Sequence, residues 1–418
     1  MSCDATGPRN SSVTSDRGGS LGEGTGFRAV FAVPEFRVLW SAAVLSTVGD
    51  QLARVALSVL VFQRTGSAAW TALTYALTML PALVSGVLLS GLADRYPRRT
   101  VMVVADVVRA VLLAVMAVPG VPLPLVAALL VVAQLAEPPF AAAQGALLPS
   151  VLGDRYEAGQ SVHLITHQAG LLLGFIGGGL VVAWLGTSGA LLADAVTFAL
   201  SALLLRFGLR LRPAPAFVPA VHVRIRAGAA LVWRDRRLRL LVGLGWLALF
   251  TVVPEGLAAP FSAEVGAGAA GVGLLLAADP AGMVLGTILL RFLPTSLRVR
   301  LLGLLAVATA LPLVGYLLAP NLVGAVALLA VSGVFSAYQV TAGATFVRLV
   351  PDEQRGQALG FARSGLVAAQ GIGVAAGGLL ASATGSPTTA IAVAGIIGTV
   401  LALTATTAWS RIAPAAVS

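Results

Sequence analysis

Long apolar stretches separated by short polar turns recur along the chain after residue 34. Each is about 20 residues or longer, the length that a helix needs to cross the hydrocarbon core of a bilayer. Glycine and proline inside such stretches are tolerated in membrane helices, because neighbouring groups satisfy the freed backbone. The pattern predicts an all-α polytopic membrane protein with twelve transmembrane helices, at residues 36–62, 70–93, 100–119, 122–147, 160–185, 187–208, 239–262, 268–291, 297–318, 320–346, 358–384 and 387–409.

The composition agrees with this pattern and excludes an ordinary soluble enzyme. Hydrophobic residues make up 58% of the 418 residues and charged residues only 11%, whereas soluble domains carry roughly 25% charged residues. No Walker loop, GxSxG elbow or HExxH motif occurs, so neither ATP nor a catalytic metal is expected. The single cysteine, Cys3, supports neither a disulfide framework nor a thiolate metal site. We therefore predict no enzyme activity and no cofactor.

The basic residues predict the orientation of the chain. All 27 are arginines, and 24 of them fall in the tails, in the even-numbered turns and in the segment after the sixth stretch. The positive-inside rule assigns that side to the cytoplasm. Both termini are then cytoplasmic in a multi-pass protein of the cell inner (plasma) membrane. The net charge of +10 is explained by anionic lipid, so no nucleic-acid partner is expected.

The turns and the charge distribution divide the chain into two six-helix bundles. The segment between the bundles contains a basic amphipathic stretch, residues 221–234, which either lies on the inner leaflet or forms a solvated linker. The expected organisation is a disordered cytoplasmic tail (1–34), an N-terminal six-helix bundle (35–208), a cytoplasmic linker with an amphipathic helix (209–238), a C-terminal six-helix bundle (239–410) and a cytoplasmic tail (411–418).

The two halves repeat one pattern around the fifth and eleventh stretches. Each has a proline, a short charged turn and a long helix that ends in paired glycines. The pairs are Gly178–Gly179 and Gly377–Gly378, which lie 199 residues apart. Two similar halves are what a transporter that rocks about a central site needs; convergent glycine-rich helices are the alternative.

These features resemble the major facilitator superfamily. The loop LSGLADRYPRR is similar to the family's signature between the second and third helices, and Leu92, Ala93, Asp94, Arg95, Arg98 and Arg99 match that signature, with Ser90 and Pro97 in place of two glycines. Gly49–Asp50, Pro139, the LLPSVL turn and VPDEQRGQALG (350–360) are similar to a drug- and siderophore-exporting branch, typified by macrolide-efflux proteins and the enterobactin exporter. The arginine usual in the fourth helix of that family is absent from this chain.

The signature loop implies a gate. In the family it forms a latch that holds the cytoplasmic side closed, and a charged turn that only sets topology is the alternative. Asp106 and Arg109 are three residues apart on one helix face, so we expect them to extend this network. The expected gating residues are Asp94, Arg95, Arg98, Arg99, Asp106 and Arg109.

The fifth stretch is similar to the family's antiporter motif. Gly170, Gly174, Gly178 and Gly179 match it, and Phe175 stands where a proline is expected. These four glycines are expected to let the helix pack tightly against a helix of the other half.

Acidic residues at membrane depth are the candidate proton-coupling groups, because ionisable groups there are costly. Asp50 and Arg54 share one helix face and are expected to form an ion pair, either in coupling or as a static element. Glu137 precedes two prolines and has no local partner, which makes it the leading proton site. Asp194, Glu255 and Asp279 are weaker candidates, and His163 and His167 are expected to pack or line a pore rather than to bind metal.

Together these observations predict a secondary active transporter. The resemblance implies export of an amphipathic small molecule, a drug, an antibiotic or a siderophore-like metabolite, by proton antiport with alternating access. An uptake symporter or a uniporter on the same fold is the alternative. The expected partners are the small-molecule substrate, protons and the lipid bilayer, with the chain functional as a monomer.

Overall fold

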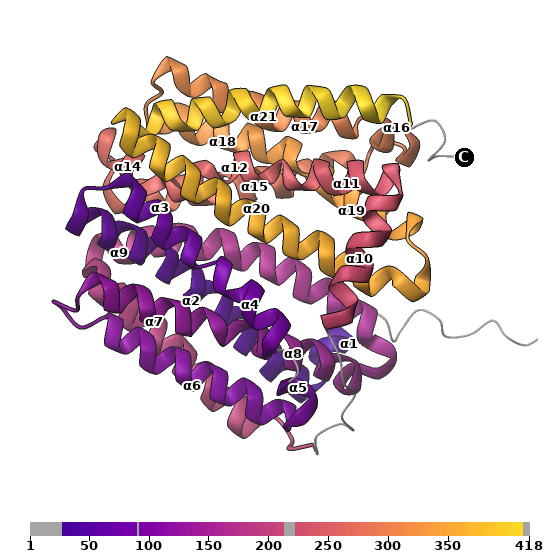
Figure 1. Ribbon diagram of the computed structural model, residues 1–418. Coiled ribbons are helices and arrows are strands. Elements are labelled where there is room, and N and C mark those ends of the chain that lie inside the picture. Colours follow the sequence, from indigo (N-terminus) through magenta and orange to yellow (C-terminus); the bar gives the residue numbers. More distant parts are fainter. Residues whose placement is uncertain (1–26, 90–91, 213–221, 413–418) are drawn as a thin grey trace, which may run out of the picture.

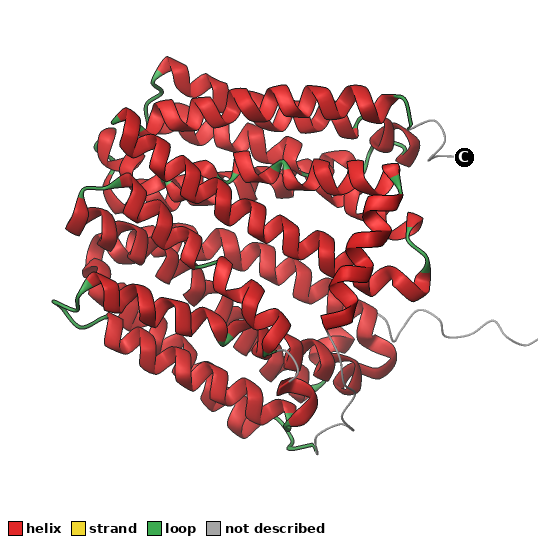
Figure 2. Cartoon of the chain, in the orientation of Figure 1, coloured by secondary structure: helices red, strands yellow, loops and turns green. Residues whose placement is uncertain are grey.

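A computed structural model describes residues 27–89, 92–212 and 222–412 of the chain. Helices account for nearly all of these residues, and no strand occurs among them (Figure 2). The predicted all-α fold is therefore confirmed. The expected tail at 1–34 lies mostly outside the described residues, as does most of the tail at 411–418.

The N-terminal half runs from the first described helix to the end of a very long one. The half ends where α9 ends, as expected for the sixth stretch. Its elements are α1 (Phe27–Phe31), α2 (Pro34–Thr65), α3 (Ala68–Leu77), α4 (Leu80–Leu88), α5 (Leu92–Arg95), α6 (Arg98–Met116), α7 (Leu123–Leu135), α8 (Glu137–Leu152), the 3-10 turn η1 (Gly153–Arg155) and α9 (Tyr156–Gly208).

The C-terminal half follows the connecting helix α10 (His222–Arg234). Prolines and glycines divide its first crossing into short pieces. Its elements are α11 (Arg236–Trp246), α12 (Ala248–Thr251), α13 (Val253–Gly256), α14 (Ala258–Glu264), α15 (Gly268–Leu290), α16 (Thr295–Arg300), α17 (Leu302–Val314), η2 (Gly315–Leu318), α18 (Leu322–Ser336), α19 (Tyr338–Leu349), η3 (Asp352–Gln354), α20 (Arg355–Thr384) and α21 (Pro387–Ser410).

A glycine kink divides α9 into two helices. Gly186 has φ 72° and ψ 177°, a conformation that glycine adopts readily because it lacks a Cβ. The kink falls between the two stretches expected at 160–185 and 187–208. The continuous helical segment α9 thus consists of two antiparallel helices that meet at Gly186.

The break between α7 and α8 shows how a proline is accommodated at membrane depth. Pro139 has no N–H to donate to the carbonyl of Leu135, four residues earlier. The Ser85 hydroxyl of α4 donates to this carbonyl instead, at 2.5 Å. A side chain from a neighbouring helix thus replaces the missing backbone hydrogen bond.

By length and hydropathy, eight helical segments qualify as membrane spans, together with the shorter apolar segment Leu302–Leu318. One of the eight, Leu123–Gly208, contains three of the expected stretches, and α6 is excluded by its charged residues Arg98, Arg99, Asp106 and Arg109. The helices agree with the expected order, and twelve crossings remain a prediction.

The two halves share a buried apolar core toward one side of the molecule and have separate cores toward the other. The largest cluster of buried apolar residues draws members from both halves. A second cluster belongs only to the N-terminal half and the connecting residues, and a third only to α10 and the C-terminal half. We call the side that holds α10 and the turn between α5 and α6 the link side, and the side with the turn between α2 and α3 the sealed side (Figure 1).

The connecting helix α10 packs on the C-terminal half rather than lying free on a leaflet. Val232 is buried, and Gly228 lies against the backbone of Gln357 and Ala358 in α20. Trp233 on the same helix is 59% exposed. The alternatives drawn from the sequence, an inner-leaflet helix and a solvated linker, both omit this contact with α20 (Figure 1).

Candidate functional site

A buried ion pair joins two helices in the interior of the N-terminal half. The guanidinium of Arg109 in α6 pairs with the carboxylate of Asp50 in α2. The Arg109 side chain is 2% exposed and that of Asp50 is 23% exposed. Phe198 of α9 covers the guanidinium, with its ring centre 4.1 Å from the central carbon, a distance at which a cation–π contact is favourable.

Two further carboxylates surround this pair. Asp106, one turn before Arg109, accepts a 2.5 Å hydrogen bond from Ser201 of α9. Asp194 of α9 accepts a hydrogen bond from Thr197 at 3.1 Å. Arg109 interacts electrostatically with both of these aspartates. Both are fully buried, so three aspartates share one arginine in the interior.

Glycine lets Asp194 come this close to α2. A Cβ at Gly49 would collide with the Asp194 carboxylate and the Thr197 hydroxyl. One oxygen of Asp194 and one of Asp106 have no hydrogen-bond partner among the described residues. Two carboxylate oxygens next to Arg109 can therefore each accept a further hydrogen bond.

A small pocket opens on this cluster. It is about large enough for one water molecule. Its lining includes Asp50, Arg54, Thr78, Arg109, Gln134 and Asp194. The ion pair is thus reachable by water or a proton but not by a drug-sized molecule in this state.

The expected ion pair between Asp50 and Arg54 is wrong. Asp50 pairs with Arg109 rather than with Arg54, because α6 brings a guanidinium to Asp50 that helix spacing alone does not reveal. Asp106 and Arg109 turn inward to Ser201 and Asp50. In this state they belong to this cluster, and their expected role in a gating network remains a prediction.

Glu137 lies where the two halves face each other. It opens α8 directly after the break at Ala136 and is half-buried. Its carboxylate interacts electrostatically with Arg109, Asp50, Arg54 and also Arg363 of α20. Glu137 is therefore the carboxylate near the cluster that is also influenced by a charge of the C-terminal half.

The arginines of the signature loop contact backbone carbonyls of their own half. Arg98 donates to the carbonyl of Ala146 at 2.7 Å, and Arg99 donates to that of Leu209 at 2.9 Å. Asp94 and Arg95 lie on α5, and the side chain of Asp94 is outside the described part. Arg98 and Arg99 therefore hold elements of their own half together in this state, and the latch expected from the signature loop remains a prediction.

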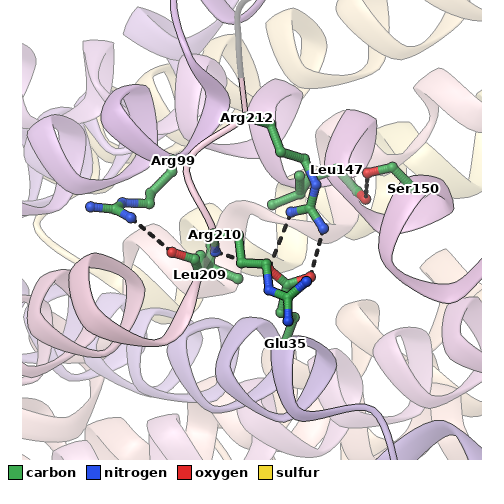
Figure 3. A network of polar contacts seen from close by, with 7 residues as sticks. All are labelled: Glu35, Arg99, Leu147, Ser150, Leu209, Arg210 and Arg212. Atoms are coloured by element: carbon green, nitrogen blue, oxygen red, sulfur yellow. Dashed lines mark hydrogen bonds and ion pairs between the residues drawn. The ribbon is translucent and has the colours of Figure 1, made fainter.

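A polar network next to this loop fixes the start of the connecting segment (Figure 3). Glu35, in the first turn of α2, accepts hydrogen bonds from both terminal nitrogens of Arg212, at 2.6 and 3.3 Å, and from the backbone N–H of Arg210 at 2.9 Å. Arg99 binds Leu209 directly before them. The chain leaving α9 is thereby tied to the first helix of its own half.

The glycines of the fifth stretch do not all face the same partner. Gly170, Gly174 and Gly178 lie against Thr47, Gln51 and Leu52 of α2, in the same half. Only the fourth, Gly179, lies against the other half. The expectation that all four pack on the other half is therefore wrong for three of them.

Gly179 meets α15 of the C-terminal half at backbone distance. A Cβ on it would lie 2.9 Å from the carbonyl oxygen of Ala269 and 3.0 Å from the Cα of Gly273. The equivalent pair repeats this arrangement, since Gly377 lies against Val253 of its own half and Gly378 lies against Ala72 of α3. In each pair, the first glycine packs within its half and the second packs across the interface.

Hydrogen bonds that involve side chains connect the halves on the sealed side. The hydroxyl of Tyr75 in α3 donates to Glu255 of α13 at 2.6 Å. Nearby, the Ala69 N–H donates to the Ser382 hydroxyl at 2.9 Å. No periodicity in the sequence links Tyr75 to Glu255, which is 180 residues away, so this pair was missed.

The remaining candidates are dispersed. His163 is half-buried and His167 exposed on α9, and Asp279 lies in α15 before Pro280. Among the described residues, no three His, Cys, Asp or Glu side chains gather in a way that would hold a metal ion. His163 and His167 therefore remain without further metal ligands in the part of the chain that is described.

No curated protein sequence matches the chain, but solved structures match its fold over most of its length. A POT family transporter in complex with 5-aminolevulinic acid is 12% identical, with a TM-score of 0.72 and coverage of 94% of this chain and 98% of that chain. The nucleoside transporter NupG is 14% identical, with a TM-score of 0.68 and coverage of 90% and 99%.

A third solved structure is a bacterial homologue of the human lysosomal transporter Spinster, in an inward-facing and occupied conformation. It is 15% identical, with a TM-score of 0.67, and the match covers 91% of this chain and 95% of that chain. At such identities the likeness shows the fold alone.

The family model described as Major Facilitator Superfamily matches residues 39–258, more than half of the chain. This match and the structural neighbours point to a membrane transporter rather than an enzyme. The family resemblance seen in the signature loop is thereby confirmed at the level of the superfamily. The chain belongs to the Major Facilitator Superfamily.

Proposed function

We propose that this protein is a proton-coupled secondary transporter that exports an amphipathic small molecule by alternating access. The observation that carries the proposal is the buried cluster of Asp50, Asp106, Asp194 and Arg109. Three carboxylates and one guanidinium would leave two uncompensated negative charges inside the membrane. Such charges are very costly unless they are neutralised, and proton binding is the simplest neutralisation.

Within the cluster, Asp50 is the proposed point of proton entry. Its side chain is 23% exposed and lines the pocket, whereas Asp194 is fully buried. A proton on Asp50 weakens its pairing with Arg109. The guanidinium then turns toward Asp194, whose second oxygen has no hydrogen-bond partner in the described part of the chain. Proton binding is thereby converted into a change in how α2, α6 and α9 are held together.

Glu137 and Arg54 extend this cluster toward the other half. Glu137 interacts electrostatically with Arg54 and with Arg363 of α20. We assign Glu137 the role of connecting the cluster to the substrate. A proton bound by the cluster changes the charge around Glu137, and Glu137 faces the space between the halves where the substrate would bind. Arg54, which is not the ion-pair partner of Asp50, is a counter-charge that Glu137 or a substrate can use.

Alternating access is supported by how the halves touch. They share one apolar cluster on the sealed side and have separate clusters on the link side. The glycine contacts Gly179–Gly273 and Gly378–Ala72 allow close backbone approach, as helix pairs in membranes require. We take the link side as cytoplasmic because most arginines lie there, with both termini inside. This state then faces inward, and one chain suffices for the cycle.

The test is substrate flux in proteoliposomes with an imposed pH gradient, using a panel of amphipathic dyes and drugs. We expect gradient-driven flux that collapses with a protonophore, and a loss of at least about tenfold in Asp50→Asn and in Glu137→Gln. Exchange of substrate without a gradient should persist in both variants. Glu157→Gln is the control, because it is the same acid-to-amide change at an exposed position of α9 outside the cluster and the pocket.

Each alternative outcome would contradict the proposal or indicate a different transport mechanism. Full gradient-driven flux in both Asp50→Asn and Glu137→Gln would contradict the proposed coupling site. Flux that is indifferent to the protonophore would indicate a uniporter. Accumulation in the same direction as the protons would indicate an uptake symporter and would remove the drug- and siderophore-exporting branch from consideration.

A further inference from the structure

Two arginines, one from each half, act on the same space between the halves. Arg54 of α2 is half-buried and Arg363 of α20 is exposed, although both belong to helices long and apolar enough to cross a membrane. Both interact electrostatically with Glu137 of α8 and with His167 of α9. Arg363 therefore acts across the interface on groups that Arg54 reaches from within the N-terminal half.

The internal repeat places Arg363 opposite the histidines of α9. Arg363 lies 14 residues before Gly377 in α20, and His163 lies 15 residues before Gly178 in α9. The arginine and His163 thus occupy corresponding levels of the two repeated helices. In transporters built from two similar halves, the substrate site lies at the interface between them.

The positive charge in this space is not fully compensated. Among the described residues, neither Arg54 nor Arg363 has a carboxylate at ion-pair distance. The interactions of Glu137 with both arginines are electrostatic, without a hydrogen bond. The neighbouring carboxylates have other partners: Asp50 pairs with Arg109, Asp106 binds Ser201, Asp194 binds Thr197 and Glu255 binds Tyr75. Two guanidinium groups therefore face one carboxylate, and His163 and His167 add positive charge whenever they are protonated.

We propose that Arg54 and Arg363 together bind an oxyanion of the transported molecule, a carboxylate or a phosphate. A guanidinium presents paired N–H donors that match the oxygens of such groups and bind them strongly. Because the two arginines belong to different halves, an anion held by both draws the halves together around the substrate. The inference rests on the proposed transport function and adds to it the charge of the substrate.

An anionic substrate also suits export coupled to proton entry. A membrane potential that is negative inside favours the outward movement of an anion and the inward movement of a proton. Both movements therefore contribute in the same direction to the free energy of transport. A cationic molecule would instead meet two like charges in the space between the halves, which disfavours its binding.

The experiment compares naphthalene compounds that share one ring system and differ in the attached group. Naphthylacetate and naphthyl phosphate are anionic, naphthylacetamide is uncharged and naphthylethylamine is cationic. Binding to the full chain in an uncharged detergent is measured from the rise in melting temperature with ligand concentration. We expect both anions to bind at least about tenfold more tightly than the amide or the amine, the effect of one charge-assisted hydrogen bond.

Substitutions locate the binding to the two arginines. Arg54→Gln and Arg363→Gln should each weaken anion binding by about tenfold. Arg363→Glu should reverse the preference, so that the amine binds more tightly than the acid. Arg300→Gln is the matched control, because it removes the same charge from an exposed position of α16 in the C-terminal half.

The proposal would be overturned if neither anion stabilised the protein, or if the amide or the amine bound as tightly as the anions. Equal weakening in Arg363→Gln and Arg300→Gln would overturn it as well. Should Arg54→Gln fail to fold, the exposed Arg363 carries the test. The measurement needs no gradient, so proton-independent flux would contradict the proposed function and leave the anion preference intact. A preference for the amine would contradict this inference and leave proton-driven flux intact.

Discussion

Gly179 of α9 and Gly273 of α15 touch backbone to backbone across the two halves of the protein. A Cβ on Gly179 would lie 3.0 Å from the Cα of Gly273 and 3.1 Å from its nitrogen. Both contacts would be made with backbone atoms, so no flexible side chain could move aside to make room for the Cβ. The position therefore sets how closely the halves approach on the sealed side.

Gly179→Ala is expected to disturb this closure without unfolding either half. The added methyl overpacks the interface at a cost of about 1–3 kcal/mol, so the melting temperature falls and the sealed-side-open state gains population. Gly177→Ala is the control two residues away, where an added Cβ would meet nothing within 4 Å. Equal melting temperatures in the two variants would show that the contact does not limit closure.

Because Asp50 pairs with Arg109, the stability of the fold should depend on this pair more than on Arg54. Asp50→Asn leaves Arg109 buried without its carboxylate, and we expect a loss of about 2–3 kcal/mol in stability. This is slightly below the range for fully buried pairs because Asp50 is partly exposed. Arg54→Gln should change stability by less than about 1 kcal/mol, as expected for a residue that is not the main partner. Thermal melts in detergent measure both effects.

A double substitution checks the same assignment. Asp50→Asn together with Arg109→Met should cost less than the sum of the two single losses, because each single change already removes the interaction between the two residues. If Asp50→Asn and Arg54→Met were non-additive to the same extent, the Asp50–Arg109 assignment would be wrong.

The Ser85 hydroxyl is predicted to support the break between α7 and α8. Ser85→Ala leaves the Leu135 carbonyl without the donor that replaces the N–H absent from Pro139, which should cost about 1–3 kcal/mol. Ser161→Ala is the control, since its hydroxyl bonds only the Glu157 carbonyl in its own exposed helix. Melts of the two variants are compared; equal values would mean that another group satisfies Leu135.

The Glu35–Arg212 pair is predicted to contribute little to global stability. The Arg212 side chain is 36% exposed, and ion pairs of this kind are worth at most about 1 kcal/mol and are screened by salt. Glu35→Gln should lower the melting temperature slightly at low ionic strength and leave it unchanged at high salt. Glu157→Gln, which changes an exposed carboxylate in the first turn of α9, is the comparison. A large effect at high salt would indicate that the network is structurally essential.

Interactions within one helix were only partly predictable from the sequence. Spacing placed Asp50 near Arg54 and Asp106 near Arg109, and both pairs do share helix faces. It did not reveal Ser201, Phe198 or Asp194, because these residues reach the cluster from a helix about 90 residues further along. The glycine motif was read correctly as a close-packing element, but the helix that each glycine meets depends on the rotation of α9.

The sequence by itself determined the helical fold, the positions of the apolar segments and the superfamily. Those properties follow from apolar length, turn residues and local motifs, all of which are short-range. Only the tertiary structure decided that Arg109, not Arg54, neutralises Asp50, that Gly179 rather than Gly170 crosses to the other half, and that Tyr75 meets Glu255. Such pairings depend on how whole helices rotate and cross, because side chains from distant segments meet only after the bundles have packed.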